Sequence, residues 1–207
     1  MNKAKARTTE FAPAGDHEAV LSAVVARRIS ALRKGHGLSF DALAQKAMVS
    51  KGTLVQIEQG GANPSISTLC RLAGALGVSV ADLVAPAEVP ERSVTVVGPA
   101  EARTLWNGPS GGSALLLAGT PGSDMLEIWT WVLMPGERFE ASVHHRGTRE
   151  LIHVMEGSLA LEVDGQSSVV ATGSTAIALT DRPHVYRNRT DAPVRFTMVV
   201  HEPAASN

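Results

Sequence analysis

The spacing of apolar residues changes once along this chain, and that change constrains the fold more than any other feature. From residue 20 to residue 84, apolar side chains recur every three or four positions, the period of an amphipathic helix. In the segment PAEVPERSVTVVGP, residues 86–99, three prolines are too closely spaced for a helix, and alternating apolar residues follow. The sequence predicts a helical domain followed by an all-β domain, each with its own core.

The expected boundaries follow from this change of period. We expect a disordered tail over residues 1–18, a helical domain over 19–84, a linker over 85–98 and a β domain over 99–203. A chain of 207 residues suits two domains of ordinary size. No apolar run approaches the roughly 18 residues that span a bilayer, and no secretory signal is visible, so we expect a cytoplasmic protein. The single cysteine, Cys70, is expected to pack in a core.

Charge is divided unequally between the two predicted domains. Residues 1–84 contain ten lysines and arginines against six acidic residues, whereas residues 85–207 contain nine against fourteen. A basic first half next to an acidic second half favours a polyanionic partner for the first half. Charge alone does not establish such a partner, because many solvated helical surfaces carry a similar surplus.

Serines and glycines mark the expected ends of five short helices. The first helix covers residues 20–34 and ends at two glycines. Ser39 and Ser50 are expected to cap the second and third helices, and Ser65 or Ser67 the fourth, because a serine hydroxyl accepts a hydrogen bond from the first helical turn. Gly77 ends the fourth helix, and residues 80–84 form a last turn.

The stretch LSFDALAQKAMVSKGTLVQIEQGGANPSISTLCRLAGALGVSVADLV, residues 38–84, resembles a known DNA-binding domain. It is similar to the five-helix domain of the phage-repressor-like, xenobiotic-response-element (XRE) family of transcription regulators, with residues 27–34 in the first helix. The resemblance implies a helix-turn-helix whose third helix enters the major groove of double-stranded DNA. One position departs from the family, because Met48 occupies a tight turn where glycine is common. A positive φ there would cost about 1 kcal/mol.

The resemblance implies a set of DNA contacts at the helix starts. Lys51, Thr53 and Gln56 are expected to read bases, because lysine donates to guanine and glutamine pairs with adenine. Backbone amides after Ser39 and Pro64 are expected to hold phosphates. The expected DNA-contacting residues are Arg28, Ser39, Ser50, Lys51, Thr53, Gln56, Asn63 and Ser65. The alternative is a helical bundle that binds a protein or supports a dimer.

Short β-rich runs recur throughout the second half, which is typical of a sandwich or barrel. The expected strands cover residues 114–117, 126–134, 150–155, 159–163, 168–171, 175–179 and 194–200. Asp164 and Gly165 are expected to form a two-residue hairpin turn. Trp129 and Trp131 share one strand face and are expected in the core, or else in the wall of a cavity for an apolar or aromatic effector.

Two segments of the β domain, PGERFEASVHHRGTRELIHVMEGSLALEVDG (135–165) and GSTAIALTDRPHVYRN (173–188), resemble the signature motifs of the cupin superfamily. The resemblance implies a double-stranded β-helix, or jelly-roll, barrel. Glu150, His184 and Asn188 match motif positions. The spacing places His145 at the second histidine position and Val143 at the first, so one position that normally supplies a metal ligand is apolar.

The neighbouring positions carry further expectations. His144 is expected on the opposite strand face from His145, and His153 is expected to point outward, since side chains alternate along a strand. Leu179 and Asp181 replace the proline and glycine usual in the second motif, which bears on the turn rather than on the ligands.

The cupin resemblance implies a candidate ligand set. His145, Glu150 and His184 would form two histidines and one carboxylate, which suits Fe(II), Mn(II) or Zn(II) with open coordination positions. The alternative is that these groups bind an organic effector, or one another, without an ion. The candidate effector-binding residues are Arg149, Glu150, His184 and Tyr186.

Taken together, the two resemblances predict a regulator that binds double-stranded DNA and a small-molecule effector. A homodimer is expected, because paired half-sites lie about 34 Å apart on one face of the duplex. One alternative is a mononuclear non-haem iron enzyme, because some iron epoxidases also place a helical domain before a cupin. Another is a barrel that only dimerises the DNA-binding domain. The apolar Val143 favours a binding pocket over catalysis.

Overall fold

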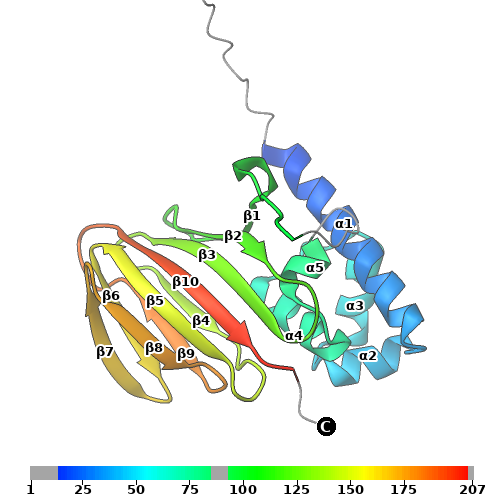
Figure 1. The fold of residues 1–207 in the computed structure, drawn as a ribbon. Coiled ribbons are helices and arrows are strands. Elements are labelled where there is room, and N and C mark those ends of the chain that lie inside the picture. The colour runs from blue at the N-terminus through cyan, green and yellow to red at the C-terminus, as the bar shows by residue number, and fades with distance from the viewer. Residues whose placement is uncertain (1–13, 85–92, 205–207) are drawn as a thin grey trace, which may run out of the picture.

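The computed structural model describes residues 14–84 and 93–204, and it shows a helical bundle packed against a β-barrel (Figure 1). The helices are α1 (Ala14–Gly35), α2 (Phe40–Lys46), α3 (Lys51–Glu58), α4 (Ile66–Leu76) and α5 (Val80–Val84). Because α1 begins at Ala14, the expected tail is wrong for residues 14–18, which are helical. Most of the expected linker, residues 85–92, lies outside the described residues.

The expected helix caps at Ser39, Ser50 and Ser65 are confirmed. Each hydroxyl accepts a hydrogen bond from the amide N–H three residues further along the chain. At the end of α4, Gly77 adopts a φ of 70° and closes the helix in the left-handed conformation. Met48 also has a positive φ, 52°, and its side chain is exposed, so the strain expected at this turn is present.

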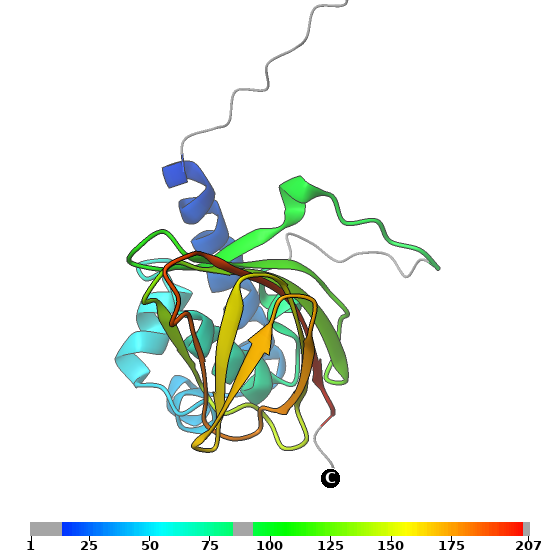
Figure 2. The ribbon, with the colours of Figure 1, turned by 90° about the vertical axis from the view of Figure 1, so that its left-hand side faces the viewer.

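Over residues 93–204, the β domain has ten strands in two sheets, preceded by a 3-10 turn at Pro99–Glu101. The strands are β1 (Arg103–Asn107), β2 (Ser113–Gly119), β3 (Met125–Leu133), β4 (Arg138–Ala141), β5 (Arg149–Glu156), β6 (Ser158–Val163), β7 (Gln166–Ala171), β8 (Thr175–Leu179), β9 (His184–Arg187) and β10 (Val194–Glu202). The six-stranded sheet has the order β1-β2-β3-β10-β5-β8, and the four-stranded sheet has the order β4-β9-β6-β7. Figure 2 shows the two sheets curving toward each other as a barrel.

All seven expected strands are present, and three more were missed. Strands β4 and β9 have only four residues each, too few for an alternation to stand out. Strand β1 carries an irregularity between Thr104 and Trp106, which interrupts its alternation. The expected hairpin at Asp164 and Gly165 is confirmed, because both residues have positive φ, 50° and 76°, and they join β6 to β7.

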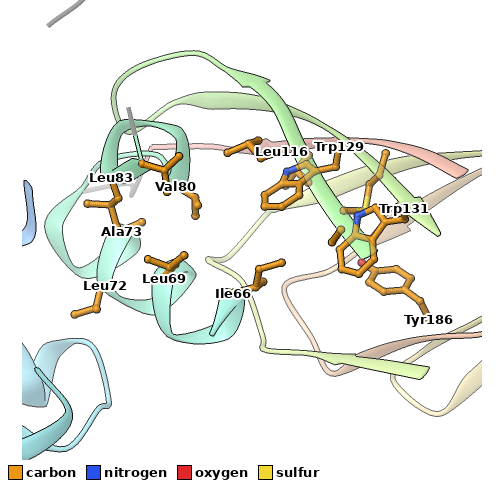
Figure 3. Packing of buried hydrophobic residues seen from close by; sticks show 14 of the residues in the cluster. Ile66, Leu69, Leu72, Ala73, Val80, Leu83, Leu116, Trp129, Trp131 and Tyr186 are labelled. Atoms are coloured by element: carbon orange, nitrogen blue, oxygen red, sulfur yellow. The ribbon is translucent and has the colours of Figure 1, made fainter. Parts of the chain in front are cut away.

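The two domains share one core, so the expectation of two separate cores is wrong. The buried apolar residues of the helices and of the barrel form a single continuous cluster. Helices α4 and α5 lie next to the barrel, and α2 and α3 lie beyond them (Figure 1). Figure 3 shows Ile66, Leu69 and Val80 on the helical side of this contact, with Trp129 and Trp131 on the barrel side. Both tryptophans are buried on the same face of β3, as expected.

Among the described residues, no helix has the length and apolar character required to cross a membrane.

Candidate functional site: a DNA-reading helix and a buried chamber

The third helix presents its polar side chains to solvent. Lys51, Thr53 and Gln56 are all exposed, while Leu54 and Ile57 on the other side of α3 are buried. This division matches the expected arrangement of a recognition helix. The Nζ of Lys51 lies 2.9 Å from the Asp41 carboxylate in an exposed ion pair. Such a pair contributes at most about 1 kcal/mol, so DNA could displace it.

A buried ion pair fixes α3 against α1. Two guanidinium nitrogens of Arg33 lie 2.6 and 2.9 Å from the two carboxylate oxygens of Glu58, and a third donates to the Leu38 carbonyl. The guanidinium also lies 4.0 Å from the ring centre of Phe40. Hydrogen bonding to Glu58 raises the pKa of Arg33. Sequence reasoning missed this pair, because the two residues are far apart in the chain.

The other expected DNA-contacting residues lie on or near the surface of the helical domain. Ser39, Ser50, Asn63 and Ser65 are exposed, and Arg28 is half-buried. The three serine hydroxyls already bond to amides of their own helices, so any phosphate contact there would involve the remaining backbone N–H groups. These phosphate contacts remain predictions.

Three side chains inside the barrel converge on one point. His144, Glu150 and His184 each offer a ligand atom, and all three atoms lie within 4.8 Å of one another. Glu150 points inward because it lies on β5, where buried and exposed side chains alternate. His184 begins β9 in the opposite sheet, and His144 comes from the loop between β4 and β5.

The hydrogen bonds around this cluster leave its ligand atoms available. Nδ1 of His184 lies 2.8 Å from the Arg182 carbonyl, which fixes the proton on Nδ1 and leaves the Nε2 lone pair free. The Tyr186 hydroxyl donates to Oε2 of Glu150. Among the described residues, Nε2 of His184 and Oε1 of Glu150 are buried without a hydrogen-bond partner. The arrangement therefore fits a divalent metal bound by two histidines and one carboxylate.

The expectation for the histidine pair is wrong. His144 faces Glu150, with Nε2 3.5 Å from Oε1, whereas His145 points toward α4. Strand alternation does not apply here, because residues 142–148 form an irregular loop with Gly147 at a φ of 88°. Val143 is 52% exposed and lies outside the site. The candidate ligand set that the structure brings together is therefore His144, Glu150 and His184 rather than the set with His145.

Arg149 is also placed differently from the expectation, and Asn188 has a structural role. Arg149 is exposed on the outer face of β5, on the opposite side of the strand from Glu150, so its expected effector contact is wrong. Asn188 is buried, and its side chain donates to the carbonyls of Leu133 and Ala192, so its role is structural. His153 points outward, as expected.

The loop that carries His144 is hydrogen-bonded to the second cupin motif, residues 173–188. The amide of His144 donates to the Thr180 carbonyl, and the amide of Gly147 donates to the Asp181 carboxylate. The Gly147 amide and Arg182 lower the pKa of Asp181. The replacement of glycine by Asp181 was visible in the sequence, but its effect on the position of His144 was not.

Burial changes the protonation of the cluster. Desolvation raises the pKa of Glu150 to about 7, against the stabilising bond from Tyr186. Desolvation and the neighbouring imidazoles lower the pKa of His144 to about 3, and desolvation also lowers the pKa of His184. Both imidazoles are therefore neutral near pH 7, the form in which histidine binds a metal.

The cluster opens into a chamber between the barrel and the helices. Its walls include Trp129, Trp131, Phe139 and Tyr186, and two further buried carboxylates, Glu127 and Glu202. Burial raises the pKa of each of these two carboxyls to about 7. None of the described residues that line the chamber is a lysine or arginine. A cation would therefore be the favoured occupant at the polar end.

Comparison with known proteins agrees with both domains. The helix-turn-helix family profile matches residues 29–83, and the cupin domain profile matches residues 129–200. The chain is 26% identical to the HTH-type transcriptional regulator SutR of Escherichia coli K12 over 185 residues, covering 88% of this chain and 97% of that protein. It is 27% identical to PuuR, another HTH-type transcriptional regulator of that strain, over 178 residues, covering 86% and 94%.

A solved structure shows the same two-domain arrangement. The crystal structure of an HTH_3 family transcriptional regulator from Vibrio cholerae superimposes with a TM-score of 0.73 and 29% identity, covering 90% of this chain and 99% of that one. The fold and the two profiles define a helix-turn-helix DNA-binding protein with a β-barrel domain. The chain therefore combines an XRE-type helix-turn-helix domain with a C-terminal cupin domain, and its homologues are HTH-type transcriptional regulators.

Proposed function

We propose that this DNA-binding regulator reads its operator through α3 and senses a ligand in the buried chamber of the cupin domain. One observation carries the proposal: the DNA-binding domain packs directly on a chamber beside which three ligand atoms converge, two of them on buried side chains. A regulator of this kind would act in the cytoplasm, where its DNA lies.

Selection of bound DNA from a random pool tests the first part of the proposal. We expect one preferred operator with nanomolar affinity at physiological salt. Gln56→Ala should weaken operator binding by about 1–3 kcal/mol and relax the preference at one base pair. Gln166→Ala, on the exposed β7, is the matched control and should bind normally. Sequence-independent binding of the wild-type protein would refute the proposal.

The three-ligand cluster is proposed to hold Fe(II), Mn(II) or Zn(II). His144, Glu150 and His184 would bind the ion, which would supply open coordination positions for an effector. Tyr186 would orient the carboxylate through its hydrogen bond to Oε2. Calorimetric titration of chelator-treated protein should show one ion per chain. Glu150→Gln should abolish binding, while the exposed His153→Ala should leave it unchanged. Equal binding by both variants would place the ion elsewhere.

A homodimer is proposed to form through the outer face of the six-stranded sheet. Ile128, Val199, Leu151 and Ile177 form a continuous cross-strand row on this face. Ile128, Leu151 and Ile177 are exposed, Ile177 to 75%. Apolar rows of this kind favour association. Analytical ultracentrifugation should find dimers that Ile177→Glu dissociates, and a wild-type monomer at micromolar concentration would refute the interface.

An iron-dependent enzyme is the second candidate function, and the ligand set itself favours it. Two histidines and one carboxylate leave open positions at which a metal could bind reactants. We nevertheless propose that the chain is not an enzyme, because the named relatives that it matches along most of its length are transcriptional regulators. Substrate-dependent dioxygen consumption by Fe(II)-loaded protein, lost in Glu150→Gln, would reverse this assignment.

A further inference from the structure

The DNA-binding domain forms one wall of the ligand chamber. Ile66, Ser67, Cys70 and Ala73 of α4 and Val80 of α5 line the same space as the barrel residues. Figure 3 shows Ile66 and Val80 on the helical side of this space, opposite Trp129. A ligand in the chamber would therefore contact both domains at once.

Polar contacts join the two walls. The Ala81 amide, in the first turn of α5, donates to Oε1 of Glu127 on β3 at 3.0 Å, and the Trp129 indole donates to Oε2 of the same carboxylate at 3.1 Å. The Gly122 amide of the barrel donates to the Asp82 carboxylate of α5 at 3.0 Å. The bonds made by the Ala81 and Gly122 amides exist only while the helices lie on the barrel, whereas the Trp129 bond lies within β3.

Two adjacent histidines connect the cluster to α4. His144 faces Glu150, and the His145 imidazole lies against Gly74. A Cβ on Gly74 would lie 1.8 Å from Nε2 of His145, so this contact depends on the glycine. The loop that supplies a ligand atom is therefore also in contact with the DNA-binding domain.

The volume of the chamber limits what it can hold while α4 and α5 are docked on the barrel. About 40 Å³ is open to the centre of a water molecule, space for about three waters. An apolar cavity that binds benzene measures about 150 Å³. While the helices are docked, this space holds a metal ion, but it is too small for the body of a molecule with an aromatic ring or a branched apolar chain. Such a molecule fits only if α4 and α5 move away from the barrel.

We propose that the effector is a compact molecule with an apolar body, and that it binds by separating α4 and α5 from the barrel. The apolar body packs between Trp129 and the α4 side chains Ile66, Cys70 and Ala73, which determine ligand specificity from the DNA-binding side. Binding breaks the Ala81–Glu127 hydrogen bond and frees the DNA-binding domain. This inference rests on the proposed function, because it assigns the ligand class and the regulation of the same chamber.

The single cysteine of the chain provides a direct test, because Cys70 lines the chamber. Benzyl methanethiosulfonate is added to the protein in urea, because burial in the folded chain raises the pKa of the Cys70 thiol. The Cys70 thiolate attacks the sulfenyl sulfur, an S–S bond forms, the sulfinate leaves with the electron pair, and the thiol proton passes to buffer. Removal of the urea then places an aromatic body at the chamber wall. Methyl methanethiosulfonate adds only a small group by the same reaction. A reductant reverses both reactions and controls for irreversible damage.

Amide hydrogen exchange reports the separation. In the benzyl adduct, we expect exchange of the Ala81 amide to accelerate about tenfold or more over the methyl adduct, because its acceptor is lost. Protection in β6 and β7 should remain. A benzyl group on Val169→Cys, an exposed site, in a Cys70→Ser background should have no effect.

Two results would overturn the inference. Equal Ala81 exchange in the benzyl and methyl adducts would show that the closed chamber accepts an aromatic body. Loss of protection in β6 and β7 as well would show global unfolding rather than domain separation. The regulatory role is judged separately by operator affinity, so accelerated Ala81 exchange without any DNA binding would sustain the chamber mechanism and refute the proposed function.

Discussion

Replacement of the buried Glu127 should change how the stability of the protein depends on pH. The carboxyl is buried between β3 and α5, and desolvation raises its pKa from 4.5 to about 7 despite the hydrogen bonds from Ala81 and Trp129. The folded state therefore holds the Glu127 proton more tightly than the unfolded state does. The resulting stabilisation is fully present below pH 4.5 and is lost as the pH rises through 7.

The magnitude follows from the two pKa values. Each pH unit between 4.5 and 7 should lower the unfolding free energy by about 1.4 kcal/mol, and the whole interval by about 3 kcal/mol. Glu127→Gln cannot titrate, so its unfolding free energy should fall less over this interval. The other buried carboxyls titrate in both proteins and largely cancel in the difference.

Urea unfolding at pH 5, 6, 7 and 8 measures the difference between wild type and Glu127→Gln. We expect the unfolding free energy of the wild type to fall more steeply than that of Glu127→Gln as the pH rises from 5 to 7. The difference between the two proteins should therefore change with pH over this interval. Glu140→Gln, on the exposed side of β4, is the matched control and should follow the wild type. Parallel profiles for wild type and Glu127→Gln would refute the assignment of the raised pKa to this carboxyl.

Three further predictions concern the DNA-binding domain. Met48→Gly should raise the unfolding free energy by about 1 kcal/mol, because glycine relieves the positive φ, and an unchanged value in chemical denaturation would contradict this. Glu58→Gln should lower the unfolding free energy by about 3–5 kcal/mol, because it leaves the buried Arg33 unpaired, and a loss far below this in the same assay would count against the buried pair. Lys51→Ala should weaken operator binding by about 1–3 kcal/mol and change the preference at one base pair. A uniform loss for all sequences, with a smaller salt dependence, would assign Lys51 to phosphate instead.

Most of the helical domain could be predicted from the sequence, because local chemistry fixes its elements. Serine caps, glycine stops and the apolar period act within a few residues, so Ser39, Ser50 and Gly77 were placed correctly. The strain at Met48 was also visible, since it depends on one turn. The pair between Arg33 and Glu58 was not, because it requires the packing of α1 on α3.

The site was predicted less well, because its geometry depends on a loop and on the other domain. Strand alternation placed Glu150 and His153 correctly, but it failed for His144 and His145, which lie outside any strand. The contact of the helices with the barrel was missed. A signal was present in ISTLCRLAGAL, the sequence of α4, where apolar residues cover more than one face and seven of eleven residues are buried.

The most direct test of the account is the operator affinity of the protein with the chamber filled. In the proposed dimer, docking of the helices on the barrels would fix the two recognition helices relative to each other, and their release would remove this preorganisation. We predict that the benzyl adduct of Cys70 binds the operator about tenfold or more weakly than the methyl adduct, and that a reductant restores the affinity. Equal operator affinities of the two adducts, with the benzyl group in place, would contradict the central claim that the chamber controls DNA binding.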